Sequence, residues 1–389
     1  MIVVNPPGNG TYWRAFHFGR VLAARGHAVT LLTKVPHPGQ RGRTYIQEGV
    51  EVVETPDWLP HKFRFGYDPW GSVYRVGWVQ RRRFDLVHAF ESRPSVLFPA
   101  LVAQHRGAKL VMDWADWFGR GGIAEENPYL LGRLVYRVVE TYFEDTFRTR
   151  ADGTTVINTF LRDRALGLGV RPENMLLIRN GSDVRLPVLP RAIARQKYSL
   201  PPDVPLIGYA GSIMQNDIGL LVEALNRVLR VRPDARLVLL SYFKHSIESK
   251  LDNPAAVIRF DQVSHTQLNE CLAGCDVCWL PLCDTGTNRG RWPFKLNVYI
   301  AAGRPVITTS VGDLESVVNR YHLGRAVPAD AQRFAAQTLE LLNDPALCDA
   351  LGAAARQAAE QVFSWEQITV ELERLYSKVM GVTAEQRRT

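Results

Sequence analysis

The sequence predicts an α/β protein of two Rossmann-like lobes, each a doubly wound parallel sheet, that face a cleft. Three observations support this fold class. Short β-branched runs alternate with helical periodicity, which is typical of parallel sheets covered on both faces. The alternation breaks once, near residue 184, and restarts from a strand–glycine–helix opening. The length of 389 residues fits two domains.

The first lobe is predicted over residues 1–183. It opens with the strand Ile2–Val4, a loop containing Gly8 and Gly10, and a helix from Tyr12 to Arg25. Its later strands are short apolar or β-branched runs: Ala28–Thr33, Phe84–Ala89, Ala108–Met112, Thr154–Ile157 and Met175–Ile178. Loops that follow the carboxyl ends of such strands are where doubly wound sheets bind ligands.

Residues 184–205 hold five prolines and no clear periodicity, so they are predicted to form a linker. The second lobe is predicted over residues 206–362. A closing helix, Trp365–Met380, lies within the final segment 363–389. The expected strands of the second lobe are Leu206–Ala210, Arg236–Leu240, Ala256–Arg259, Val277–Leu280 and Pro305–Thr309.

Composition excludes two classes of protein. With 46% hydrophobic and 22% charged residues, the chain can bury a core and is not intrinsically disordered. No apolar run reaches the roughly 18 residues needed to span a bilayer. The start, Met1 to Pro7, lacks the apolar stretch of a signal peptide. We therefore expect a cytoplasmic protein.

The net charge of +8 is concentrated in the first half of the chain. Residues 1–185 hold 25 Lys and Arg against 18 Asp and Glu, whereas the remainder holds 22 against 21. A basic first half indicates an anionic partner, such as a membrane surface, a nucleic acid or a phosphorylated acceptor. Nucleic acid is disfavoured because nothing matches a recognised binding module.

Four of the five cysteines are clustered, which permits either a metal site or apolar packing. They are Cys271, Cys275, Cys278 and Cys283. The paired CxxC spacing of structural zinc is absent, and Cys278 falls in an apolar run. We therefore predict packing, with no metal and no other cofactor.

Five segments, in order, resemble the GT-B glycosyltransferases, and most of all the family-four (group 1) retaining enzymes. They are PPGNGTYWRAFHFGRVLAARGHAVTLLT, RPENMLLIRNGSD, LIGYAGS, GRWPFKLNVYIAAGRPVITT and FSWEQ. The resemblance implies transfer of a sugar from a nucleotide-sugar donor to a glycan or lipid-linked acceptor, in cell-surface polysaccharide biosynthesis. It also implies a donor site in the second lobe, an acceptor side in the first, and a final helix that crosses back to the first lobe.

Cations near residue 290 are the predicted donor-binding groups. Arg289, Arg291 and Lys295 precede or start a helix, where helix-end amides and positive charge both favour a departing diphosphate. A solvated basic loop is the alternative. The turn at Gly211 and Ser212 could offer further amides, or be a plain tight turn. By the same logic, Gly8 and Gly10 are predicted to line the cleft from the first lobe.

The sequence DWADWF supplies the candidate catalytic groups. Asp113 and Asp116 follow a predicted strand, and Trp114 and Trp117 are suited to stacking on a sugar ring. In the resemblance this segment aligns with a loop ending in a His-Asp pair, with Ala115 at the His position. We predict that Asp116 contacts the sugar or acts in acid–base chemistry, the alternative being a loop cap.

The donor motif departs from the family it resembles. The two expected glutamates fall on Gly290 and Val298, and the expected diphosphate-binding Arg and Lys fall on Ser212 and roughly Asp217. One interpretation is an active variant that uses the relocated cations, with sugar or nucleotide contacts from Asn297 and Tyr299. Another is a catalytically silent GT-B binding subunit of a transferase complex. A third is a sugar-nucleotide epimerase.

The segment Trp58–Arg83 is basic and rich in aromatic residues. Asp68 and Pro69 indicate a helix start, after which Trp70, Val73, Tyr74, Gly77 and Trp78 share one face. Arg75, Arg82 and Arg83 lie elsewhere on it and are expected to be available to a partner. Such a helix suits an anionic membrane surface. An ordinary helix packed on the first lobe is the alternative. A peripheral location on the inner face of the membrane is therefore one expectation.

Overall fold

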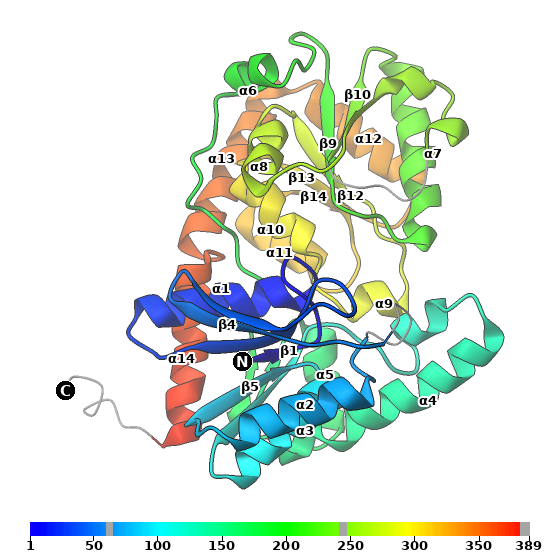
Figure 1. Ribbon diagram of the computed structural model, residues 1–389. Coiled ribbons are helices and arrows are strands. Elements are labelled where there is room, and N and C mark those ends of the chain that lie inside the picture. Colours follow the sequence, from blue (N-terminus) through cyan, green and yellow to red (C-terminus); the bar gives the residue numbers. More distant parts are fainter. Residues whose placement is uncertain (60–64, 241–246, 382–389) are drawn as a thin grey trace. The chain divides into compact units, whose positions relative to one another are not determined.

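Two β-sheets organise the chain, and each belongs to its own structural unit (Figure 1). The computed structural model describes residues 1–59, 65–240 and 247–381. The first unit contains residues 1–180, the short segment 290–292 and the chain from residue 365 onward. The second unit contains residues 181–289 and 293–364. Both are α/β structures, which confirms the predicted fold class.

The sheet of the first unit is parallel except at one edge, where β3 pairs antiparallel with β4. Its central strands are apolar and buried on both sides, as expected of a sheet covered by helices. In sheet order the strands are β3 (Arg43–Gln47), β4 (Val50–Thr55), β2 (Thr30–Lys34), β1 (Ile2–Val3), β5 (Leu86–Phe90), β6 (Lys109–Trp114), β7 (Gly153–Val156) and β8 (Met175–Leu177).

Helices cover both faces of this sheet. Valines and alanines of α2 and α3 pack with β1, β5 and β6 in one core, while α1 and α14 pack together elsewhere on the sheet. The elements are α1 (Thr11–Ala24), α2 (Pro69–Gln80), α3 (Pro94–His105), α4 (Leu130–Thr146), α5 (Thr159–Gly167), α14 (Trp365–Met380) and the 3₁₀ turns η2 (Ile123–Glu126), η3 (Arg148–Arg150) and η4 (Pro172–Asn174).

The closing helix α14 belongs to the first unit, as the resemblance implied. Trp365 is fully buried, and its ring stacks on His17 of α1 with 4.8 Å between centroids. Further along, Tyr376 Oη lies 2.6 Å from His88 Nδ1 in β5. Burial lowers the pKa of His88 to about 3, so the imidazole is neutral and the contact is an ordinary hydrogen bond. These contacts fix α14 against α1 and the sheet.

The second unit holds a parallel sheet, and its core is built around Trp279 of β12. The indole Nε1 donates to Thr338 Oγ1 of α12 at 3.1 Å. The strands, in sheet order, are β11 (Val257–Phe260), β10 (Arg236–Leu240), β9 (Leu206–Ala210), β12 (Val277–Leu280), β13 (Val306–Thr309) and β14 (Gly324–Val327). The helices and 3₁₀ turns are α6 (Arg191–Lys197), α7 (Gln215–Val231), η5 (Glu248–Lys250), η6 (Pro254–Ala256), α8 (His265–Ala273), α9 (Gly286–Arg289), α10 (Phe294–Ala301), α11 (Leu314–Tyr321), α12 (Ala331–Leu342) and α13 (Pro345–Gln361).

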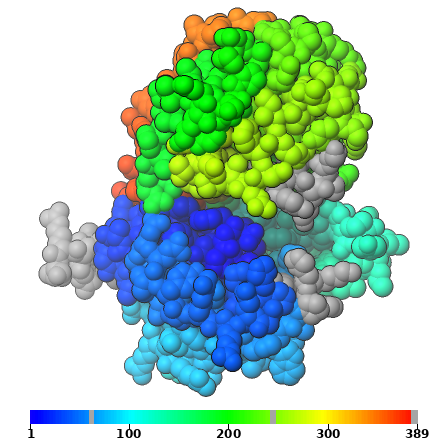
Figure 2. Space-filling view, turned by 45° about the horizontal axis from the view of Figure 1, so that its top comes forward, coloured from blue at the N-terminus to red at the C-terminus, as the bar shows by residue number. Residues whose placement is uncertain are grey.

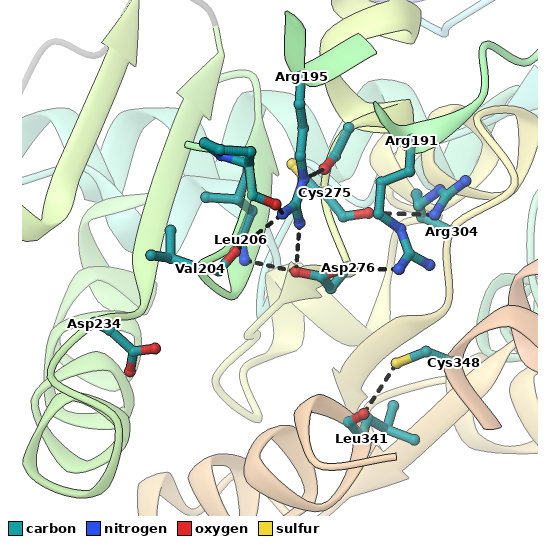
Figure 3. A network of polar contacts seen from close by, with 12 residues as sticks. Arg191, Arg195, Val204, Leu206, Asp234, Cys275, Asp276, Arg304, Leu341 and Cys348 are labelled. Carbon is teal, nitrogen blue, oxygen red and sulfur yellow. Dashed lines mark hydrogen bonds and ion pairs between the residues drawn. The ribbon is translucent and has the colours of Figure 1, made fainter. Parts of the chain in front are cut away.

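The segment predicted to be a linker contains the helix α6, which is anchored to the second unit. Arg195 is buried and donates to Asp276 Oδ2 at 2.8 Å and to the carbonyl oxygen of Gly274 at 2.9 Å (Figure 3). Asp276 also accepts from the amide of Leu206 at 2.7 Å, at the start of β9. The prolines of 184–205 suggested a linker, but none of them lies inside this helix. Pro190 is the residue before its first turn, where proline is tolerated.

Candidate active site

A small cavity of about 10 Å³ lies at the carboxyl ends of β5 and β6, within the first unit. This is room for one water molecule. The DWADWF segment forms one wall, and charged side chains from β5, α3 and α4 form the others. Its acidic lining residues are Glu91, Asp113, Asp116, Glu140 and Glu144, and its basic ones are Arg93 and Arg148.

Asp116 is half-buried at this cavity, and its backbone forms an isolated bridge with Arg291. Desolvation raises the pKa of Asp116 to about 6, although the positive charges of Arg291 and Arg93 oppose the shift. A carboxyl group with a pKa near neutrality can exchange a proton at working pH. The predicted catalytic role of Asp116 stays a prediction, and a pKa near neutrality is compatible with it.

Asp113 is a buried anchor. Its two oxygens accept from Arg14 Nε and Nη2, each at 3.0 Å, and Oδ1 also accepts from Thr155 Oγ1. Burial disfavours its charge, but the ion pair with Arg14 outweighs burial and the pKa of Asp113 is lowered. Because its oxygens are already engaged, we assign Asp113 to positioning β6 and α1 rather than to contact with substrate.

Glu91 is a candidate that the sequence did not reveal. It directly follows β5 with a backbone φ of 132°, a region that non-glycine residues rarely adopt. Its carboxylate accepts from Thr11 Oγ1 at 3.1 Å and Arg93 Nη1 at 3.2 Å. Desolvation raises the pKa of Glu91 to about 7. Backbone strain beside a cavity is typical of functional sites.

Trp114 and Trp117 differ in what they can contact. The ring of Trp114 is 1% exposed and lies 3.7 Å beneath the Arg148 guanidinium, so it has no open face for a sugar. Trp117 is half-buried, and its ring packs against Phe160 at 5.1 Å. Within the described chain its buried indole N–H has no hydrogen-bond partner. Of the two predicted stacking residues, only Trp117 is partly exposed, and its contact with a sugar stays a prediction.

Glu144 of α4 holds the DWADWF segment in shape. Its carboxylate accepts from Trp114 Nε1 at 3.2 Å and from the amides of Phe118 and Gly119 at 2.8 and 2.6 Å. Burial raises the pKa of Glu144 to about 7. This residue is 28 positions after Asp116, so no local pattern connected the two.

The glycine loop after β1 carries Gly8 and Gly10 with φ of 85° and 48°, which favour glycine. Both are exposed. A side chain at Gly10 would meet Asn5 at 2.8 Å, and Asn5 Oδ1 caps the start of α1 by accepting from the Thr11 amide at 3.2 Å. Their predicted contact with a ligand stays a prediction.

In the second unit, Lys295 lies against the turn after β9. Its Nζ donates to the carbonyl oxygen of Ser212 and sits 5.2 Å from the centre of the Tyr209 ring. Gly211 has a φ of 71°, and a side chain there would meet the Lys295 Cε at 3.5 Å. Pro293 caps α10, so Lys295 is in the first turn as predicted. A cation, a glycine turn and a helix start thus share one place.

The other two predicted donor cations have partners of their own. Arg289 is exposed and forms a two-pronged ion pair with Asp284, with both N–O distances at 2.6 Å. Arg291 is counted with the first unit, where its charge acts on Asp116. Arg289, Arg291 and Lys295 were predicted to converge on one anion. In the described contacts, Arg289 instead pairs with Asp284.

Asn297 and Tyr299 lie on the buried face of α10, with 1% and 0% exposure. Tyr299 Oη accepts from the amide of Ala210 at 3.0 Å, which fixes the end of β9 just before Gly211. The carbonyl oxygen of Asn297 accepts from Ser182 Oγ at 3.0 Å. Both predicted sugar contacts are thus interior residues, of which Tyr299 positions neighbouring backbone and Asn297 contacts the hydroxyl of Ser182.

Two family models match most of the chain. Residues 9–181 match the glycosyl transferase 4-like domain, and residues 204–344 match the glycosyl transferases group 1. The chain belongs to the group 1 glycosyltransferases of the GT-B fold.

Relatives agree with this assignment. The glycogen synthase of Mycobacterium tuberculosis is 25% identical over 92% of this chain and 89% of its own length. The sucrose-phosphate synthase of Thermosynechococcus elongatus shares the fold with a TM-score of 0.76, at 20% identity, over 97% of this chain and 96% of its own. An Anabaena protein solved with UDP-glucose, HepE, gives a TM-score of 0.70 at 14% identity, over 97% and 98%.

Asp217 of this glycosyltransferase is a structural carboxylate. Asp217, near the position of the expected lysine, is buried and accepts from the Cys283 amide at 2.8 Å and Asn288 Nδ2 at 3.0 Å. Asp217 therefore shapes the loop that leads into α9. The departure seen in the sequence has a physical use in the fold.

The cysteines of the glycosyltransferase are all free thiols. Cys271, Cys275 and Cys278 are buried, and burial raises the pKa of each. Among the described residues, no three ligating side chains gather in a group that could hold a metal.

The segment predicted to meet a membrane does form a helix, α2, whose N-cap Asp68 accepts from the Trp70 amide. Residues 60–64 of this segment lie outside the described residues. Trp70, Val73 and Tyr74 are exposed, and their predicted membrane contact stays a prediction. The prediction for Arg75 was wrong, because its buried guanidinium donates to the carbonyl oxygen of Val3 at 2.8 Å. None of the described helices is long and apolar enough to cross a membrane.

Proposed function

We propose that this glycosyltransferase transfers a sugar from a nucleotide-sugar donor to a glycan or lipid-linked acceptor in cell-surface polysaccharide biosynthesis. The observation that carries the proposal is Lys295 beside the Gly211 turn at the start of α10. A cation and exposed helix amides stabilise the negative charge that develops on a departing diphosphate. The Anabaena relative solved with UDP-glucose supports a donor of this class.

In the proposal, Asp116 acts on the reacting sugar or the acceptor. An ionised Asp116 would stabilise an oxocarbenium-like transition state or take the proton of the acceptor hydroxyl. Its pKa of about 6 keeps it mostly ionised at neutral pH. Glu91 would orient the acceptor or relay the proton through the water-sized cavity. We expect retention of anomeric configuration, which the NMR coupling constant of the product tests.

The proposed location is the cytoplasm, at the inner face of a membrane. Trp70, Val73 and Tyr74 of α2 support membrane contact, because large apolar side chains on a basic domain suit an anionic lipid surface. No metal or other cofactor enters the proposed reaction.

Calorimetric titration with nucleotide sugars that vary in base and sugar tests the donor. We expect binding of one class with a Kd below a millimolar, and hydrolysis or transfer by the purified chain. Absence of binding at millimolar donor would refute the proposal. Binding without hydrolysis or transfer would identify a silent subunit, and conversion of the donor sugar without acceptor would identify an epimerase.

A further inference from the structure

Helix α4 of the first unit turns an apolar face to solvent. From residue 130 to residue 142, every exposed residue of the helix is apolar or aromatic. Their exposed fractions run from 50% to 75%, which is high for side chains of this size. They are Leu130, Leu131, Leu134, Val135, Val138 and Tyr142, and the exposed Tyr129 precedes them. An apolar face this continuous marks an interaction surface.

The opposite face of α4 is charged and buried, which explains why the apolar face stays outside. Glu140 pairs with Arg93 at 2.9 Å, and Glu144 holds the amides of Phe118 and Gly119. These contacts line the candidate site. The helix is therefore inverted relative to an ordinary surface helix, which buries its apolar stripe.

Exposed aromatic side chains also lie on neighbouring helices of the same unit. Phe143 of α4 packs against Tyr67, just before α2, at 6.0 Å and against the exposed Phe98 of α3 at 6.2 Å. Trp58 packs against Tyr74 of α2 at 6.2 Å, and both are exposed. Figure 2 shows the N-terminal part of α4, in teal, at the molecular surface.

Two exposed arginines lie near the C-terminal end of this face. The Arg120 amide donates to Thr141 Oγ1 of α4 at 2.8 Å, which places Arg120 beside the helix. The Arg150 guanidinium lies 5.1 Å from the ring centre of Phe147, just past the helix end. Both arginines are exposed. Aliphatic side chains with tyrosines at their margins and cations at one end match the chemistry of an anionic bilayer, apolar within and negative at its surface.

We propose that α4 lies in the headgroup layer of an anionic membrane, with Leu130 to Tyr142 inserted. The inner face of the same helix lines the candidate site, so membrane and site are separated by the width of one helix, about 10 Å. The site then serves an acceptor that is anchored in the bilayer and whose polar head reaches that far. This statement about the acceptor rests on the proposed function, whereas the membrane contact does not.

Vesicle co-sedimentation tests the surface. The probe is phosphatidylcholine vesicles with or without one third phosphatidylglycerol. The variant is Leu131→Asp with Val138→Asp, at positions 75% and 69% exposed. The matched control is Ile193→Asp with Val231→Asp, at positions 50% and 61% exposed in the second unit. We expect the natural chain and the control to bind the anionic vesicles, and the variant to bind at least tenfold more weakly.

Two results would overturn the proposal. One is equal binding by the natural chain and the variant, or none by either. The other is a natural chain that is dimeric in sedimentation equilibrium and loses its dimer in the variant, since a second copy would then cover the face. Donor titration on the same proteins separates the membrane contact from the proposed function. A natural chain that binds vesicles but no donor would refute only the proposed function.

Discussion

The candidate site in the first unit and the one in the second unit are built in opposite ways. Around Asp116, the first unit gathers buried carboxylates and arginines from β5, β6, α3 and α4. Around Lys295, the second unit uses a turn and one helix start, and the lysine reaches the surface. The first arrangement tunes pKa values by burial, whereas the second holds a charge ready for an anion. Proton chemistry and anion binding have different structural requirements, and the proposed function assigns one of them to each unit.

The sharpest test of this difference is Asp116→Asn. We expect transfer activity to fall by about 10²- to 10⁴-fold, since the variant keeps the shape but loses the charge and the proton exchange. The pKa of Asp116 is about 6, so activity of the natural chain should rise between pH 5 and 7. The variant should lose this limb of the pH–rate profile.

Stability separates a catalytic role for Asp116 from a structural one. A raised carboxyl pKa means that the folded state binds more protons than the unfolded state between about pH 4 and pH 6, so ionisation of Asp116 destabilises the fold. Asp116→Asn should therefore unfold no earlier at pH 7. The exposed Asp163→Asn is the control and should keep full activity. An inactive variant that also melts early would argue against catalysis.

Asp113→Ala should have the largest effect on stability. It leaves the buried Arg14 without its carboxylate, and breaking such a pair costs about 3–5 kcal/mol of unfolding free energy. Denaturant unfolding measures the loss. Asp252→Ala removes an exposed pair with Arg230 and should cost below about 1 kcal/mol. Equal losses for the two variants would contradict the anchoring role of Asp113.

Lys295→Ala tests the second unit. We expect donor affinity to fall by roughly 10- to 150-fold, equivalent to about 1.5–3 kcal/mol for a hydrogen bond to a charged group. The fall should be the same for a free nucleoside diphosphate, because the lysine is assigned to the diphosphate. Lys250→Ala, an exposed lysine of the same unit, should leave affinity unchanged. Unchanged affinity in Lys295→Ala would remove Lys295 from this role.

The smallest effect is expected at Gly211. Its φ of 71° makes Gly211→Ala unfavourable by about 1–2 kcal/mol, and the loss should appear in the second unit's unfolding. Gly219→Ala, in the middle of α7 with open space around it, should have the opposite sign because alanine favours a helix by about 1 kcal/mol. A neutral Gly211→Ala would show that the turn tolerates change.

The same contrast explains which features the sequence predicted. Most strands and long helices were found because their apolar periodicity is local, and Trp365–Met380 matches α14 residue for residue. The strands β3, β4 and β14 were missed. β3 is an exposed edge strand with little apolar content, and β14 contains Gly324 and Arg325. The position of Lys295 in a first helical turn was predicted correctly because Pro293 marks a helix start within the same few residues.

The first unit's site was only partly predictable. DWADWF indicated a site, but Glu91, Glu140 and Glu144 come from elements far apart in the sequence and meet only in the folded sheet. Nothing local distinguishes a carboxylate that will be buried against amides from one in solvent. Trp114, Asn297 and Tyr299 were predicted to contact a ligand, but all three are buried. Their burial depends on tertiary packing, which the local sequence does not reveal. Helix α4 escaped notice for the same reason, since its inversion is visible only in the fold.

The buried carboxylate of Asp217 also limits how this site could change. Asp217→Lys would introduce a cation of the kind the family resemblance expects, yet it would remove the acceptor of the Cys283 amide and one of the two acceptors of Asn288 Nδ2. A lysine there would succeed only after the loop into α9 had found other support. A lysine at position 217 is thus coupled to the loop before α9, and we expect it to be tolerated only together with a replacement acceptor for these two donors.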